Sequence, residues 1–350
     1  MTSLIKMGEA EKQNVTAVIT GVTSNLGINI CYRLIKSLPS STNLTLVVTS
    51  RTLPRVTEAI NNINEFSKKL NRSGSLEFDY LLVDFTDMVS VLATCYELIK
   101  KFAKIDYLFV NAAQGVYSGI DWPKAFMEVL KNPVESATNP TYKKQKIGVQ
   151  SVDGLGLVFQ ANVFGPYYLI RRIRRLLKGG RVIWISSLMS QPKYLSLNDL
   201  QLLKSPDSYE GSKRLVDLMH FGVYKKLKRD NNIEQYLVNP GIFVSFSFYK
   251  FLNFFTYYGM LFLLLLARLL GSTSHNISGY KAANAPVSCA VRGETQSLKV
   301  ESSCTRSGKE YLSYFEVDTT GSEDVINYLE NLCHLYDEKF KNQIVNTRQP

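Results

Sequence analysis

Residues 15–27 read VTAVITGVTSNLG, and this stretch decides the fold that the sequence predicts. Val15 to Ile19 form an apolar run of strand length, and Thr20 to Gly27 follow as a turn that contains two glycines. The next residues, Ile28 to Leu38, have the apolar spacing of a helix. A strand, a glycine-containing turn and a helix N-terminus together present backbone N–H groups to an anion such as a pyrophosphate.

This turn departs from the usual dinucleotide-binding pattern at Asn25, which stands where a middle glycine is expected. Asparagine tolerates a positive φ better than most other non-glycine residues, so we expect the turn geometry to survive. The alternative interpretation is an ordinary β-to-α turn of a parallel sheet that binds nothing.

Length and composition predict one large α/β domain. The chain has 350 residues, of which 45% are hydrophobic, and short apolar strands alternate with helical segments. This alternation predicts a doubly wound parallel sheet of the Rossmann type. We expect residues 1–13 to be an N-terminal extension and residues 14–350 a single domain, with an insertion at 114–155 and an apolar segment at 246–275. The polar start lacks a signal-peptide core, which predicts a cytosolic fold.

The cysteines and histidines predict no metal site and no disulfide framework. The five cysteines are odd in number and show no Cys-x-x-Cys spacing, which indicates reduced, structural thiols. The three histidines are scattered along the chain, so we expect them at the surface or in packing positions.

The net charge of +11 favours an anionic partner surface over nucleic acid. Basic residues gather at the C-terminal half of a helix expected over Phe159 to Leu177. They are either a solvated helix end favoured by the helix dipole or a patch attracted to an anionic membrane. No basic motif interleaved with aromatic residues accompanies them, so we expect no nucleic-acid binding.

The end of the second expected strand bears on the choice of cofactor. Leu44 to Thr49 are followed by Ser50, Arg51 and then Arg55. A carboxylate at this point would bond the ribose 2′-hydroxyl of NAD, whereas hydroxyl residues and arginines suit the 2′-phosphate of NADP. Two solvated arginines are the alternative.

Polar residues also end the next expected strands. Tyr80 to Val83 end in Asp84, and Tyr107 to Val110 end in Asn111-Ala112-Ala113. In a parallel sheet of this kind the carboxyl ends of the strands meet the ligand. The long polar stretch from Gln114 to Asp153 then follows, and its length is typical of a lid, a partner surface or a disordered loop.

Tyr209 and Lys213 lie one helical turn apart in the stretch Tyr209-Glu210-Gly211-Ser212-Lys213. The spacing alone proves little, because four other pairs share it, namely Tyr32/Lys36, Tyr96/Lys100, Tyr142/Lys146 and Tyr224/Lys228. Only the pair at 209 lies between a strand ending in Ser187 and a strand ending in Pro240-Gly241. We expect the Lys213 ammonium to lower the phenol pKa from its usual ~10.

These residues converge on carbonyl reduction. A hydride added to a ketone carbon leaves an alkoxide that needs a proton and hydrogen-bond donors. Tyr209 can supply the proton, Ser187 can donate to the same oxygen, and Asn162 can hold a water that links Lys213 to solvent. Taken singly, Ser187 and Asn162 are as well explained as structural polar groups.

Five motifs follow one another along the chain: Thr20 to Gly27, Asn111-Ala112-Ala113, Asn162, Ser187 and Tyr209/Lys213. This ordered set resembles that of the short-chain dehydrogenases/reductases. The resemblance implies a catalytic tetrad of Asn162, Ser187, Tyr209 and Lys213, with Lys213 also bonding the nicotinamide ribose. Ser245 stands where the family often has a threonine that contacts the carboxamide. The expected cofactor-binding residues are Gly21, Thr23, Asn25, Leu26, Gly27, Thr49, Ser50, Arg51, Arg55, Asp84, Asn111, Ala112, Tyr209, Lys213, Pro240, Gly241, Ile242 and Ser245.

Six segments spread over nearly the whole chain carry a narrower resemblance: Asn139–Lys143, Phe159–Tyr168, Lys193–Leu203, Tyr209–Leu218, Leu252–Leu261 and Gly279–Val287. They resemble segments of the fungal reductases of sterol 3-ketones within this family. This resemblance implies NADPH-dependent reduction of a sterol 3-ketone, such as zymosterone to zymosterol, in C-4 demethylation during ergosterol synthesis. It also implies partners: the C-4 methyl oxidase, the decarboxylating dehydrogenase, a scaffold protein and oxidosqualene cyclase. The implied location is the cytosolic face of the endoplasmic reticulum or lipid droplets.

The segment from Phe251 to Leu270 supports a lipid substrate, because nearly every residue in it is apolar or aromatic. Its length would nominally span a bilayer, but a crossing here would divide one sheet across the membrane. We expect a pair of helices that covers the substrate and dips into the membrane interface, and a buried core or dimer helix is the alternative. The expected last elements are a strand at Glu310 to Val317 and a surface or partner-facing helix at Ser322 to Lys341.

Two functional classes follow. One is the ketone reductase, for which the tetrad is intact. The other is a scaffold or chaperone for other sterol enzymes, in which the long loop and the apolar segment carry the function and catalysis is dispensable.

Overall fold

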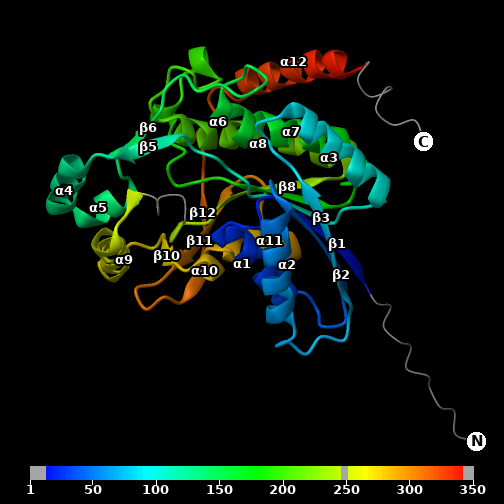
Figure 1. Ribbon diagram of the computed structural model, residues 1–350, viewed down its shortest axis with the longest axis horizontal. Helices are drawn as coiled ribbons and strands as arrows, with labels where there is room; N and C mark the ends of the chain where they lie inside the picture. Colours follow the sequence, from blue (N-terminus) through cyan, green and yellow to red (C-terminus); the bar gives the residue numbers. More distant parts are fainter. Residues whose placement is uncertain (1–12, 246–250, 342–350) are drawn as a thin grey trace, which may run out of the picture.

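The computed structural model describes residues 13–245 and 251–341, and an eight-stranded sheet forms the centre of this part of the chain (Figure 1). The strand order is β12-β11-β8-β7-β4-β1-β2-β3. Every neighbouring pair is parallel except β11 and β12. The strands are β1 (Asn14–Ile19), β2 (Asn43–Ser50), β3 (Leu76–Leu82), β4 (Tyr107–Val110), β7 (Arg181–Ile185), β8 (Glu234–Asn239), β11 (Lys299–Cys304) and β12 (Glu310–Phe315).

Helices cover both faces of the sheet, which confirms the doubly wound α/β fold. Above it in Figure 1 lie α3 (Met88–Lys101), α6 (Leu157–Phe159), α7 (Gly165–Ile173), α8 (Ser208–Asn231) and α12 (Ser322–Phe340). Below it lie α1 (Asn25–Ser37), α2 (Leu53–Ser67), α10 (Gly279–Ala282) and α11 (Asn284–Val291). Because both faces are covered, central strands are apolar runs rather than alternating ones. In β7, for example, Trp184 packs into one core layer and Ile185 into the other.

The helix expected over Phe159 to Leu177 is irregular. Helix α6 continues through a π-helical stretch, Gln160–Phe164, into α7. A π turn places one extra residue in the helix, and such turns are frequent at functional sites. Asn162 lies in this turn and is buried.

Strand β11 was not predicted. It reads Lys299-Val300-Glu301-Ser302-Ser303-Cys304, and all six residues are buried. Polar residues on a strand indicate a solvent-facing side, but here the polar side chains face polar partners inside the protein. The strand joins the antiparallel edge strand β12 to the parallel sheet.

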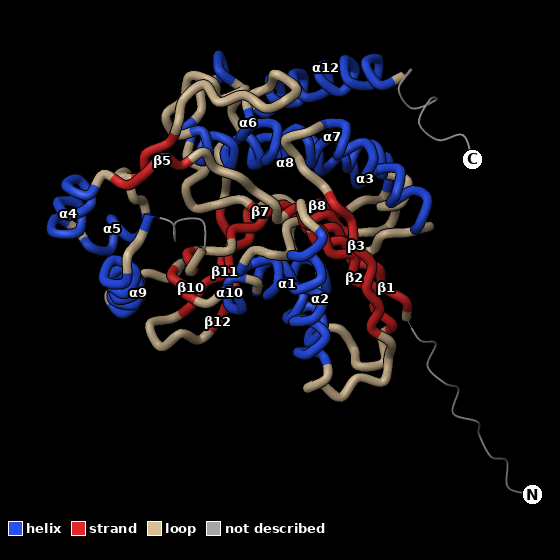
Figure 2. Tube along the Cα trace, viewed as in Figure 1, coloured by secondary structure: helices blue, strands red, loops and turns tan. Residues whose placement is uncertain are grey.

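The insertion at 114–155 is ordered and carries four elements. Strands β5 (Tyr117–Ile120) and β6 (Lys143–Gln145) pair with each other, and α4 (Trp122–Lys131) and α5 (Pro133–Thr138) connect them. Helix α5 packs against α9 (Phe254–Leu269), and α4, α5 and α9 lie together at the left of Figure 2. Segments that are more than 100 residues apart in the sequence therefore form one part of the molecule.

The apolar segment forms one helix in the part that the structure describes, so the expected helix pair is wrong. Asn253 accepts a hydrogen bond from the Thr256 backbone N–H at 3.0 Å and begins α9. The helix then runs for 16 residues. None of the helices within residues 13–245 and 251–341 has the length and hydropathy needed to cross a membrane. Of the expected extension at 1–13, the structure describes only Gln13. The start of the expected apolar segment, at 246–250, also lies outside the described residues.

Helix α12 belongs to the core rather than to the surface alone. Its residues Val325, Leu329, Cys333 and Phe340 are buried in the same layer as α8. Asp337 of α12 also pairs with Arg171, so part of the expected basic helix end is not simply solvated. All five cysteines are free and buried, which confirms that they are structural thiols.

Candidate active site

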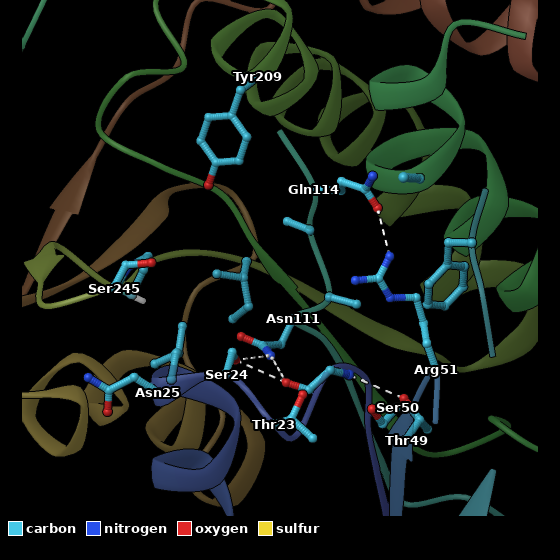
Figure 3. Close-up of a pocket in the computed structure, with 18 of the residues that line it drawn as sticks. Thr23, Ser24, Asn25, Thr49, Ser50, Arg51, Asn111, Gln114, Tyr209 and Ser245 are labelled. Atoms are coloured by element: carbon cyan, nitrogen blue, oxygen red, sulfur yellow. Dashed lines mark hydrogen bonds between the residues drawn. The ribbon is translucent and has the colours of Figure 1, made fainter. Parts of the chain in front are cut away.

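A cavity of about 400 Å³ opens at the carboxyl ends of the parallel strands. Figure 3 shows its lining, with the turn after β1 below, Arg51 on one side and Tyr209 above. The expected residues that line it are Gly21, Thr23, Asn25, Leu26, Thr49, Ser50, Arg51, Arg55, Asp84, Asn111, Ala112, Ser187, Tyr209, Lys213, Pro240, Gly241 and Ser245. Three expected residues do not line it, namely Gly27, Asn162 and Ile242.

The turn after β1 places the N-terminus of α1 at this cavity. Gly21 has a φ of +65°, and a Cβ there would lie 3.0 Å from the Ala112 Cα. Ser24 caps α1 by accepting a hydrogen bond from the Gly27 N–H at 3.0 Å. A Cβ on Gly27 would lie 2.4 Å from the Gly21 carbonyl oxygen, so Gly27 allows close packing rather than contact with a ligand. The positive end of the helix dipole and the absence of a Cβ at Gly21 fit a phosphate group.

The turn geometry survives as expected, but Asn25 does not adopt a positive φ, so the reason that we gave for its tolerance is wrong. It is the first residue of α1. Its side-chain amide donates to the Val244 carbonyl at 2.7 Å, and its Oδ1 accepts from Asn29 at 2.9 Å. Asn25 therefore ties the turn to the segment that follows β8.

Asn111 joins the end of β4 to the same turn. Its side-chain amide donates to the Gly21 carbonyl at 3.0 Å (Figure 3), and it also donates to the Thr20 carbonyl at 2.9 Å. Its backbone N–H donates to the Thr20 hydroxyl at 2.8 Å. Asn111 thus fixes the shape of the turn after β1.

The end of β2 presents hydroxyl groups and arginines to the cavity. The Thr49 hydroxyl accepts from the Gly21 N–H at 3.2 Å, and Ser50 lines the wall next to it. Arg51 is exposed and lies 3.5 Å from the Gln114 side-chain oxygen, as Figure 3 shows. Arg55 of α2 lines the same end. This end of the cavity is therefore lined by two cations, Arg51 and Arg55. Neither β2 nor its connection to α2 contributes a carboxylate to the lining.

Tyr209 and Lys213 reach the cavity from the first turns of α8. The Tyr209 ring extends toward the cavity with its hydroxyl directed to the space above Ser24 and Asn111 (Figure 3). The Lys213 ammonium donates to the Ile185 carbonyl at 2.8 Å and lies 5.5 Å from the centre of the Tyr209 ring. Both side chains come from one helix face, as their spacing predicts.

The electrostatics of this pair differ from our expectation. Burial, followed by the negative charge of Glu210, raises the pKa of Tyr209 above its ordinary value. Burial lowers the pKa of Lys213 to about 8, against a smaller opposing effect from Asp217. The loss of water around the phenol outweighs the nearby ammonium, which itself is partly deprotonated at mildly alkaline pH. Tyr209 therefore stays protonated at neutral pH and can act as a proton donor.

The first turn of α8 depends on Gln145 of the insertion. Asp207 precedes this helix but makes no side-chain capping bond. Gln145 Oε1 instead accepts from the Tyr209 N–H at 3.0 Å and the Ser208 hydroxyl at 3.1 Å. Its amide group donates to Glu210 at 2.6 Å. Nothing in the sequence pattern indicated this contact, because the insertion and α8 are far apart in the chain.

Ser187 and Asn162 have different environments. Ser187 follows β7 and lines the cavity with Tyr209 and Lys213. The Asn162 side chain accepts from the Gln114 N–H at 2.7 Å, and it donates to the Gln114 carbonyl at 2.9 Å and to Ser212 at 2.9 Å. These bonds hold the loop after β4 and leave the side chain outside the cavity, so its expected role in binding a water stays a prediction. Ile242 lies on β9 (Ile242–Phe243), and its N–H donates to the Ser274 carbonyl.

Two charged residues near this site were missed. Asp217 lies one turn after Lys213 on α8, and Lys299 lies on β11, where the two side chains form an ion pair of 2.8 Å. The i+4 spacing from Lys213 could have indicated Asp217. Nothing in the sequence indicated Lys299, because the strand that carries it was not predicted.

The comparisons with known proteins agree with this geometry. A model of the short chain dehydrogenase family matches residues 15–248. The 3-keto-steroid reductase of Debaryomyces hansenii is 72% identical over 336 residues, covering 95% of this chain and 97% of that protein. The 3-keto-steroid reductase ERG27 of Saccharomyces cerevisiae is 57% identical over 342 residues, covering 95% and 98%.

A solved structure is similar in fold. The L-sorbose reductase of Gluconobacter frateurii, complexed with NADPH and L-sorbose, superposes with a TM-score of 0.53 at 18% identity, covering 81% of this chain and 92% of that one. The turn after β1, the Tyr209/Lys213 pair and the family match over most of the chain lead to one assignment. The chain belongs to the short-chain dehydrogenase family.

Proposed function

We propose that this protein is an oxidoreductase that uses NADPH to reduce the 3-ketone of a sterol to the 3-alcohol. The observation that carries the proposal is the convergence of Tyr209, Lys213 and Ser187 on the cavity beside the turn after β1. Relatives that cover almost the whole chain at up to 72% identity are named 3-keto-steroid reductases, which supports the same substrate class.

The nicotinamide supplies a hydride to the carbonyl carbon when the cofactor is bound. As the carbonyl oxygen gains negative charge, Tyr209 gives it the proton of its hydroxyl, and the Ser187 hydroxyl donates a hydrogen bond to it. Lys213 places a positive charge beside the phenol, which stabilises the phenolate that forms. The raised pKa of Tyr209 keeps the proton in place until the alkoxide develops.

The preference for NADPH rests on Arg51 and Arg55. Both line the cavity at the end of β2, where the adenosine ribose lies in dinucleotide-binding folds of this type. A 2′-phosphate would meet two guanidinium groups there, whereas a free 2′-hydroxyl would meet no carboxylate from β2.

An apolar face beside the cavity suits a water-insoluble substrate. Phe243 lines the cavity, and its neighbour Ile242 packs against the cluster of Leu264 and Ala267 on α9. Helices α4 and α9 expose large apolar side chains on this part of the molecule. We call them the α4–α9 face: Trp122, Phe126, Met127, Leu130, Phe254, Phe255, Tyr258, Phe262, Leu265 and Leu269.

The α4–α9 face would contact a lipid surface from which the sterol enters, because large apolar side chains that are exposed on one part of a protein mark an interaction site. The cytosolic face of the endoplasmic reticulum and the lipid droplet are the surfaces that we propose. Other enzymes of C-4 demethylation and oxidosqualene cyclase are the protein partners that this location would bring together.

The test is sterol-dependent oxidation of NADPH by the detergent-solubilised protein, followed at 340 nm with a 4-demethyl 3-keto sterol. We expect the 3-alcohol as product and a loss of kcat of about 10²- to 10⁴-fold in Tyr209→Phe. Tyr224→Phe is the matched control, because Tyr224 also precedes a lysine by four residues on α8. Protein that binds NADPH but turns over no 3-keto sterol would contradict the proposed function, and undiminished turnover by Tyr209→Phe would contradict the proton donor.

A further inference from the structure

An ion pair lies buried directly behind the segment that carries Ser187. Lys299 of β11 and Asp217 of α8 are 2.8 Å apart, and their side chains are only 7% and 1% exposed. Neither residue lines the cavity. A buried ion pair contributes little net stability compared with apolar residues of the same volume, so its presence calls for another explanation.

The contacts of Lys299 converge on the segment from Ser186 to Ser190. Its ammonium donates to the Ser187 carbonyl at 2.7 Å, the Ser190 hydroxyl at 2.6 Å and Asp217 at 2.8 Å. These three acceptors use all three of its protons.

Asp217 holds the same segment from the helix side. It accepts hydrogen bonds from the Ser186 hydroxyl and from the Ser190 hydroxyl, the latter at 2.6 Å. Together the two charged side chains bind the hydroxyl groups of Ser186 and Ser190 and the backbone carbonyl of Ser187. The Ser187 hydroxyl is left to accept a bond from the Met189 N–H at 3.1 Å, with its own proton available.

We propose that Lys299 and Asp217 are a pair of positioning residues, which hold the Ser187 hydroxyl at the distance from the Tyr209 hydroxyl that the reaction requires. This inference rests on the proposed reductase function. Fixed donors around a developing charge accelerate a reaction only when the surrounding bonds hold them in place. The pair supplies these bonds from β11, which lies next to the edge strand β12, and from helix α8.

The pair also acts on Lys213. Burial lowers the pKa of Lys213 to about 8, while the charge of Asp217 raises this pKa and the charge of Lys299 lowers it further. Among the described residues, Asp217 on α8 and Lys299 on β11 are the charged groups that shift this pKa, and the neutral Tyr209 ring lies beside Lys213 on α8. Removing the charge of Asp217 and removing the charge of Lys299 should therefore shift the pKa of Lys213 in opposite directions.

The first experiment removes the pair without leaving a buried charge, in the double variant Lys299→Met/Asp217→Leu. We expect it to fold, because apolar replacement of a buried pair is tolerated, and to lose kcat by roughly 10- to 100-fold. The KM for NADPH should change less than threefold. The control is Arg181→Met. This substitution breaks the 2.9 Å ion pair between Arg181 and Glu234, which lies at the amino ends of β7 and β8, away from the cavity. It should leave kcat unchanged.

The second experiment compares Asp217→Asn with Lys299→Met in the pH dependence of kcat/KM. The reaction needs protonated Lys213, so activity falls as pH rises through its pKa. Removing the Asp217 charge lowers that pKa and moves the alkaline limb to lower pH. Removing the Lys299 charge moves the limb to higher pH, since Asp217 keeps its bonds from Ser186 and Ser190 and stays ionised. A structural role alone would shift both variants alike or neither.

A third measurement does not depend on turnover. Amide hydrogen exchange of the peptide that spans residues 186–190 should be faster in the double variant than in the wild type, and unchanged in Arg181→Met. If the wild type turned over no 3-keto sterol, the proposed function would be contradicted, but the hydrogen-exchange measurement would remain valid. Unchanged exchange in the double variant, or pH limbs that move in the same direction, would overturn the positioning role.

Discussion

Replacing Arg51 by alanine should separate the two nicotinamide cofactors. Arg51 is exposed at the end of β2 and its nearest polar partner is the Gln114 side chain, 3.5 Å away. It makes no ion pair within the described residues that would be broken by the substitution. Arg51→Ala should therefore leave the fold intact and remove one cation from the region that would receive the 2′-phosphate.

The expected magnitude follows from Coulomb's law. Two unit charges 4 Å apart attract by ~1 kcal/mol in water and by ~4 kcal/mol near a protein surface. Because Arg51 is exposed, the lower end of this range applies, about 1–2 kcal/mol. This corresponds to a roughly 5- to 30-fold increase in the KM for NADPH, with the KM for NADH unchanged. Arg55→Ala should have an effect of similar size.

The assay is steady-state reduction of a sterol 3-ketone with each cofactor, at low and at physiological ionic strength. Salt shortens the Debye length from ~30 Å at 0.01 M to ~8 Å at 0.15 M, so it should weaken NADPH binding more in the wild type than in Arg51→Ala/Arg55→Ala. Arg229→Ala is the matched control, because Arg229 is exposed at the far end of α8 and pairs with Asp230. An equal loss with NADH and NADPH would refute the reasoning.

Two further predictions concern the turn and the apolar face. Gly21→Ala should lower the melting temperature by several degrees and weaken NADPH binding in a fluorescence titration, because φ is +65° and a Cβ would lie 3.0 Å from Ala112. Gly119→Ala, where a Cβ would meet nothing within 4 Å, is the control, and equal effects of the two would contradict the account. Phe255→Ser/Phe262→Ser, two positions that are 81% and 66% exposed, should reduce co-sedimentation with phospholipid vesicles and leave turnover in detergent unchanged. Leu335→Ser on α12, 61% exposed, should bind vesicles like the wild type, and undiminished binding by the double variant would exclude the α4–α9 face as the lipid contact.

The parts of the site that could be predicted from the sequence are those fixed by neighbouring residues. The turn from Thr20 to Gly27 follows its strand directly, and Tyr209 and Lys213 share one helix, so spacing alone places them. Arg51 could be placed in the same way, because the end of a parallel strand meets the ligand. In each case the relevant contact involves residues within one βα unit or at the end of its strand.

The parts that could not be predicted depend on solvent exclusion and on distant contacts. The pKa of Tyr209 is raised rather than lowered, because burial of the phenol acts more strongly than the charge one turn away. Asn162 has the position expected for a catalytic residue, but its side chain is used by Gln114 and Ser212. Sequence spacing gives neither the amount of water around a group nor the partner that reaches it from another element.

Strand β11 also could not be predicted, because its polar residues are explained by contacts with distant parts of the chain. Lys299 and Glu301 alternate along it, so both side chains project from the same side of the sheet. Lys299 binds the segment after β7, while Glu301 accepts from Asn239 at 2.6 Å, and Asn239 in turn accepts from the Gly241 N–H at 3.0 Å. Two loops of the cavity are therefore held by one face of one strand. Lys299 and Glu301 are charged residues, which made β11 difficult to predict as a buried strand, and they are the residues through which it holds these loops.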